Sequence, residues 1–175
     1  YRQRIAAQRS LGNYHKRTEK HIACNTAHLL QPDIERQLNI RITSMVDATI
    51  DYVSRHHKTI RLLASPTTIR TGLYDKPLKT VGVTVLTPDD NERQELETII
   101  RALIAGRAVP QLALEKVERI AKFDRVEINN YVENHLNNPP ILLGCTELSC
   151  AFAKKPNTID PMNVLINHLA TRGIL

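Results

Sequence analysis

Short apolar runs alternate along this chain with longer stretches in which apolar residues recur at helical spacing. Runs of strand length predict strands at 22–24, 42–45, 59–65, 82–87, 141–143 and 159–162. Helical spacing and helix-starting residues predict helices at 26–38, 46–57, 69–74, 88–105, 111–136 and 163–169, with a further helix after Cys145. Strands that alternate with helices in this way are typical of an α/β fold with a mostly parallel sheet flanked by helices.

Polar or thiol side chains follow four of the predicted strands. Cys24, Thr68, Thr87 and Cys145 each lie at or just after the carboxyl end of such a strand. Ligands of parallel α/β sheets bind at this edge. The pattern therefore predicts a site assembled from four separate segments of the chain.

Two of these four residues are cysteines with similar surroundings, each at the start of a predicted helix. For Cys24, the helix dipole and nearby backbone N–H groups predict a thiol pKa below its usual value of about 8.5. A buried, inert cysteine fits the Cys24 segment equally well when it is considered alone. A pair of thiols can do more, because one thiolate can remove the α-proton of a small acid while the other thiol returns a proton to the opposite face.

Composition limits the kinds of partner and the compartment that we expect for this protein. The net charge is +6, but the basic residues are scattered and the chain has no Trp and two Phe, so we expect no nucleic-acid partner. No apolar run is long enough for a membrane span, and the first residues do not resemble a signal peptide. Three cysteines without CxxC spacing argue against a disulfide framework or a zinc site and favour the reducing cytoplasm. We expect Cys150 to be a packed, small apolar residue.

Three motifs in this order resemble the aspartate/glutamate racemase family, the cofactor-independent amino-acid racemases. CNTAH at 24–28 is similar to the first catalytic motif of that family, and LGCTEL at 143–148 is similar to the second. LASPTTIRTGLY at 63–74 resembles the strand and loop that lie between them. The endings Ala-His and Glu-Leu of the two cysteine motifs are more similar to the aspartate racemase branch. The resemblance runs from about residue 20 to the end of the chain.

The resemblance implies two similar lobes, each with a mostly parallel sheet, and an active site in the cleft between them. We expect residues 1–45 together with 159–175 to form the first lobe and residues 46–158 to form the second. Cys24 and Cys145 would be the two acid/base residues. The resemblance implies no pyridoxal phosphate, metal or other cofactor, and it implies a homodimer.

The same resemblance assigns the substrate contacts. The residues expected to bind the carboxylate and amino groups of an acidic amino acid are Asn25, Thr26, Thr68 and Thr146. His28 and Glu147 are candidates for tuning the two thiols. Arg107 is a candidate contact for the distal carboxylate, with a surface charge at a helix end as the alternative.

One segment that the family normally carries is missing from this sequence. Family members begin with a Gly-rich loop after a first strand, and we find none here, so we expect the amino-terminal part of the protein to be absent from this chain. Two other functions stay open on the sequence alone. They are a related Cys-dependent decarboxylase or maleate-type isomerase, and a non-catalytic amino-acid-binding relic. The motifs do not distinguish aspartate from glutamate.

Overall fold

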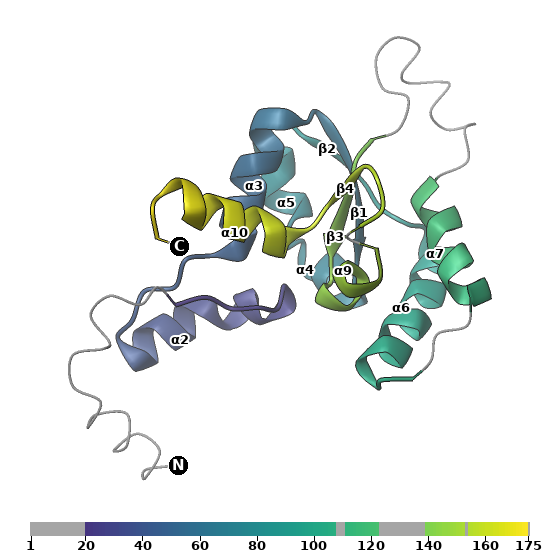
Figure 1. Ribbon diagram of the computed structural model, residues 1–175, viewed down its shortest axis with the longest axis horizontal. Coiled ribbons are helices and arrows are strands. Elements are labelled where there is room, and N and C mark those ends of the chain that lie inside the picture. Colours follow the sequence, from purple (N-terminus) through teal and green to yellow (C-terminus); the bar gives the residue numbers. More distant parts are fainter. Residues whose placement is uncertain (1–19, 108–110, 123–138, 153, 175) are drawn as a thin grey trace.

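The computed structural model describes residues 20–107, 111–122, 139–152 and 154–174 (Figure 1). The segment before the sheet contains η2 (Thr26–Leu30), α2 (Gln31–Leu38) and α3 (Met45–His56). The sheet and its helices follow as β1 (Thr59–Ala64), α4 (Pro66–Thr71), α5 (Asp75–Thr80), β2 (Thr84–Leu86), α6 (Asp90–Ile104), α7 (Gln111–Lys122), β3 (Ile141–Gly144), α9 (Thr146–Phe152), β4 (Thr158–Ile159) and α10 (Pro161–Thr171).

The four strands form one parallel sheet in the order β2-β1-β3-β4. The chain passes from β1 to β2 on one side and then returns to place β3 on the other side of β1. This reversal makes the carboxyl ends of β1 and β3 the topological switch point, where such sheets open a crevice for ligands. The predicted α/β class with a parallel sheet is confirmed.

Helices cover both faces of the sheet because the central strands are apolar on both sides. In β1, Ile60, Leu62 and Ala64 pack in the cluster that includes α3 and α5, whereas Leu63 packs with α6, α7 and α9. This alternation follows the two-residue period of a strand. Figure 1 shows the same two layers, with α3, α5 and α10 on one side and α6 and α7 on the other.

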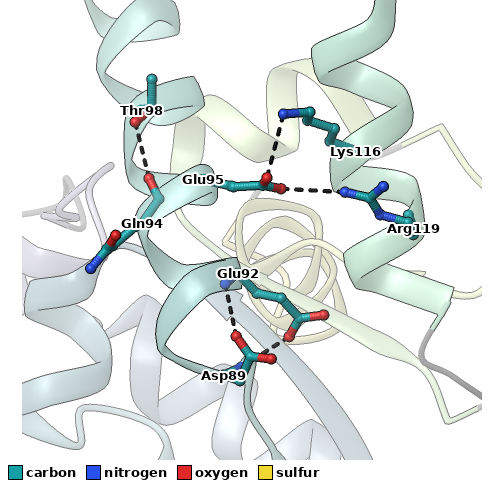
Figure 2. Close-up of polar contacts among 7 residues, drawn as sticks. All are labelled: Asp89, Glu92, Gln94, Glu95, Thr98, Lys116 and Arg119. Carbon is teal, nitrogen blue, oxygen red and sulfur yellow. Dashed lines mark hydrogen bonds and ion pairs between the residues drawn. The ribbon is translucent and has the colours of Figure 1, made fainter.

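Helix α6 begins at a capping box and is tied to α7 by charge. The Asp89 carboxylate accepts a hydrogen bond from the Glu92 backbone N–H, and the Glu92 carboxylate accepts one from the Asp89 backbone N–H, both at 2.9 Å. Glu95 on α6 pairs with Lys116 and Arg119 on α7, both at 3.4 Å (Figure 2). Surface pairs of this kind contribute about 1 kcal/mol or less, so the apolar cluster between the helices does most of the packing.

The segment before α3 lies outside the four-stranded sheet and has little strand pairing of its own. Lys20 and Ile42 form one isolated parallel bridge, with the Thr43 N–H donating to the Lys20 carbonyl at 2.9 Å. The last part of the described chain is joined to the sheet through β4, which pairs with β3. Helix α10 then packs on α3 through Leu165 and Leu169. The division of the chain into two lobes stays a prediction.

Most predicted elements are present, but several differ in kind or extent. The predicted strand at 22–24 is wrong, and that at 42–45 is reduced to the bridge at Ile42, because the described residues supply no further strand for either to pair with. The predicted helix at 69–74 instead starts at Pro66, capped by Ser65, and ends at Gly72, whose φ of 70° stops it. Helix α5 was not predicted, and the predicted helix residues 123–136 lie outside the described residues.

Candidate active site

Cys145 is the first residue after β3 and immediately precedes α9. Its side chain is 7 % exposed and belongs to the same apolar cluster as Leu148 and Phe152. The preceding residue must be glycine for steric reasons. A Cβ at Gly144 would lie 2.9 Å from both the Ala64 Cβ and the Leu62 Cδ1. Close packing of β3 on β1 therefore determines where this thiol lies.

The Cys145 thiol is held by a carboxylate. Its S–H donates to the Glu147 Oε2 at 2.9 Å, and the Thr146 hydroxyl donates to the same oxygen at 3.2 Å. Burial, together with the adjacent Glu147 charge, raises the pKa of Cys145 from 9.0 to about 12. For Glu147, burial opposes ionisation, but the hydrogen bonds from Cys145, its own backbone and Thr146 prevail and lower its pKa.

Cys24 lies in an exposed, irregular segment just before η2. The next residue anchors this segment, because Asn25 is 2 % exposed and its Oδ1 accepts a hydrogen bond from the fully buried Tyr74 hydroxyl. Burial is the main cause that raises the pKa of Tyr74 well above its usual range. The phenol therefore keeps its proton and remains a donor to Asn25.

His28 holds the Cys24 backbone, not its thiol. The Nδ1–H donates to the Cys24 carbonyl at 2.8 Å, and the Nε2 accepts from the Met45 N–H at 3.2 Å. Both ring nitrogens are thus engaged, which requires the neutral imidazole with its proton on Nδ1. The ring links the Cys24 segment to the first turn of α3.

Thr26 connects the first motif to the sheet. Its Oγ1 lies 3.2 Å from the Thr68 Oγ1 and 3.5 Å from the Ser65 Oγ. Ser65 and Thr68 lie 3.1 Å apart, so the three hydroxyls form a cluster at the carboxyl end of β1. Two of these residues, Thr26 and Thr68, were predicted to bind substrate.

The register of the sheet brings the second motif to the same place. Ala64 on β1 and Gly144 on β3 are partners in adjacent parallel strands, so Ser65 and Cys145 are the next residues along neighbouring strands. Neighbouring strands lie about 4.8 Å apart. Through Thr26 and Ser65, the Cys24 segment therefore lies at the β1/β3 switch point, where Cys145 also lies.

Other predicted residues lie elsewhere. Arg107 is exposed after the end of α6, and no polar contact in the described part of the chain joins its side chain to the predicted site residues. Thr87 follows β2, at the edge of the sheet. The expectation that Cys150 is packed is wrong, because Leu148 and Phe152 turn the opposite face of α9 to the core and leave Cys150 exposed.

Sequence reasoning missed two residues of this site. Ser65 carried a signal, because a serine before proline at the end of a strand is a common helix cap, and its Oγ does accept from the Thr68 N–H. Tyr74 carried none, because its contact with Asn25 spans 49 residues. Only the folded chain brings these two side chains together.

Two hollows elsewhere on the molecule are lined by neither Cys24 nor Cys145. One of about 460 Å³ lies between α3 and α10, and one of about 310 Å³ lies beside β3. Within the described ranges, no three His, Cys, Asp or Glu side chains are grouped as they would be to hold a metal ion. No helix in the described part of the chain is long and apolar enough to cross a bilayer.

Comparisons with known proteins agree with the motifs. The family described as Asp/Glu/hydantoin racemase matches residues 21–169. An aspartate racemase homologue from Pyrococcus horikoshii is 26% identical, with a TM-score of 0.67 over 96% of this chain and 71% of that one. A putative Asp/Glu racemase from Yersinia pestis is 23% identical, with a TM-score of 0.71 over 98% of this chain and 75% of that one.

A third solved structure, the aspartate racemase of Picrophilus torridus, is 22% identical, with a TM-score of 0.58 over 87% of this chain and 60% of that one. The last two similarities show the fold alone, and the chain spans only part of the length of each of these proteins. The family match, by contrast, spans most of the chain. The protein therefore belongs to the Asp/Glu/hydantoin racemase family, and its enzyme class is that of the amino-acid racemases.

Proposed function

We propose that this protein is a cofactor-independent racemase of an acidic amino acid, aspartate or glutamate, and that Cys24 and Cys145 exchange the α-proton. One observation carries the proposal. Thr26 contacts Ser65, and Ser65 is the strand neighbour of Cys145, so two thiol motifs distant in sequence meet at the switch point of the sheet.

The chemistry needs only the two thiols and solvent. The thiolate of one cysteine takes the α-proton, and the electron pair of the C–H bond stays on the α-carbon. The S–H bond of the other cysteine then breaks, and its proton adds to the opposite face of that carbon. The product is the mirror image of the substrate. The enzyme returns to its starting form when the first thiol loses a proton to water and the second thiolate gains one.

The hydroxyl groups around the thiols are suited to holding the substrate. We assign Thr26, Thr68 and Thr146 to the carboxylate and amino groups of the amino acid. The Asn25 carboxamide is turned inward to Tyr74, so we assign the contribution of Asn25 to its backbone N–H. Arg107 remains our candidate for the distal carboxylate because of its charge. We also propose that the enzyme is a cytoplasmic homodimer, which its free thiols and its family favour.

Solvent exchange at the α-carbon tests this function. In deuterated water, L- or D-aspartate or glutamate should gain deuterium at the α-carbon and lose optical activity. Cys24→Ala and Cys145→Ala should each lower racemisation at least ~100-fold, as expected for loss of a group that transfers the proton. Cys150→Ala is the matched control, because its thiol is exposed on the far face of α9.

Three results would redirect the proposal. Full racemisation without either thiol would contradict the two-base mechanism. Turnover of a malonate or of maleate, with no exchange of amino acids, would indicate the decarboxylase or isomerase chemistry of related enzymes. Binding of aspartate without exchange at its α-carbon would indicate an amino-acid-binding protein.

A further inference from the structure

In the Cys145 motif, a small hydrogen-bonded cluster includes the thiol itself, unlike the hydrogen bonds of the Cys24 motif. One oxygen of Glu147 accepts two hydrogen bonds, from the Cys145 S–H at 2.9 Å and from the Thr146 hydroxyl at 3.2 Å. The Thr146 bond orients the carboxylate, and the thiol bond requires that the sulfur carry its proton. The corresponding polar contacts of the first motif go to the Cys24 backbone carbonyl and to Asn25 and Thr26.

We propose that Glu147 is a positioning residue that keeps Cys145 in its thiol form, so that in the free enzyme Cys145 is the proton donor and Cys24 supplies the base. This inference rests on the proposed two-base racemase and assigns unequal roles to its two thiols. It also gives a function to the Glu within the second cysteine motif.

Repulsion between like charges explains why the thiol form of Cys145 is favoured. Deprotonating Cys145 would place a thiolate 2.9 Å from the Glu147 carboxylate in a half-buried site, and like charges at that separation repel strongly. Glu147 is the ionisable group that acts electrostatically on this sulfur in the described part of the chain, and the raised pKa of the thiol agrees with that contact.

The proton balance of one turnover follows. The α C–H bond breaks and its proton goes to the Cys24 thiolate. The Cys145 S–H bond breaks and its proton adds to the opposite face of the carbanion, which leaves a thiolate beside Glu147. Repulsion from the carboxylate then favours reprotonation of Cys145 from water while Cys24 releases its proton to water. The turnover in the reverse direction must start from the less populated form.

The protonation state of each thiol can be measured directly by NMR. In protein labelled with [3-¹³C]cysteine, the Cβ shift of each residue reports its own thiolate, with signals assigned by single Cys→Ala variants. Cys150 is the internal reference for an exposed thiol. We expect Cys145 to remain a thiol at pH 10, where an ordinary cysteine with a pKa of about 8.5 is mostly thiolate.

Glu147→Gln should move this titration because it removes the charge and keeps the size of the side chain. We expect the Cys145 midpoint to fall by at least one pH unit, with the reference thiol unchanged. Glu147→Asp, which keeps the charge at a greater distance, should give an intermediate midpoint and serves if the Gln variant does not fold. Glu115→Gln, an exposed charge on α7, is the control for a general change of surface charge.

The size of this shift decides the proposal. A Cys145 midpoint that moves by less than about 0.3 unit in Glu147→Gln would overturn it. Because the NMR titration needs no substrate, failure of the racemase assay alone would contradict the proposed function and not the state of the thiol.

Discussion

The two cysteine motifs look alike in the sequence but are held in place by different forces. Cys145 follows a buried strand, and the apolar side chains of β1, β3 and α9 position it. Cys24 follows no strand in the described chain, and hydrogen bonds from Tyr74 and His28 hold its segment. Apolar side chains near the first motif, including Leu29, Leu30 and Leu38, are exposed.

This difference predicts how each motif responds to change. Packing free energy is spread over many contacts, so the Cys145 motif should lose its structure only when the whole domain unfolds. The Cys24 segment depends on a few directional bonds, and loss of one of them should loosen that segment first. The site needs both, because the proposed chemistry uses one thiol from each motif.

The largest effect is expected from Leu148→Ala on α9. Leu148, the last residue of the Cys145 motif, is fully buried, and a Leu→Ala change in a core lowers the free energy of unfolding by about 2–5 kcal/mol. Leu38→Ala is the matched control near the other motif, where the side chain is 60 % exposed and the change should stay within about 0.5 kcal/mol. Urea unfolding measures both, and equal losses would remove the distinction between the motifs.

Tyr74→Phe should give an intermediate effect concentrated at the Cys24 segment. The variant keeps the ring in the core but leaves the Asn25 Oδ1 without its donor, which costs about 1–3 kcal/mol. Hydrogen exchange of the amides in residues 24–30 should rise, whereas the amides of β3 should change little. Tyr52→Phe on α3, where the side chain is 37 % exposed, is the control. Equal exchange changes in both segments would show that the two motifs are not held separately.

The smallest effect concerns alkaline pH. The folded chain raises the pKa of Cys145 from 9.0 to about 12, so it keeps a proton that the unfolded chain loses. Stability from this group is complete below about pH 9 and decreases as pH rises toward 12. Between pH 8 and 11 the free energy of unfolding should fall by about 1–2 kcal/mol, after a discount for solvent screening at this half-buried site.

Tyr74 also has a raised pKa and lowers stability in the same direction above pH 10. Because Tyr74 is present in the wild type and in Cys145→Ala alike, the difference between these two proteins isolates the contribution of Cys145. Urea unfolding at several alkaline pH values should show a flatter dependence in the variant. Cys150→Ala should retain the full slope. Identical slopes in all three proteins would mean that burial and Glu147 do not act on the Cys145 thiol as described.

Local sequence predicted the elements that carry strong local signals. The β1 strand, the α6 helix with its acidic cap and the β3 strand before Cys145 were all expected, because strand-length apolar runs and capping residues act over a few positions. Elements that depend on distant partners were not. The predicted strand at 22–24 needed a neighbouring strand, and α5 had no clear cap or apolar period.

The sequence by itself determined the family, the α/β class and the two thiol motifs with the hydroxyl residues around them. Tertiary structure decided how these parts meet. The register of β1 on β3 makes Ser65 the neighbour of Cys145, and Tyr74 reaches Asn25 across 49 residues. Tertiary structure also decided that Cys145 is the buried, protonated thiol, because burial and the direction of the Glu147 side chain arise only when the chain is folded.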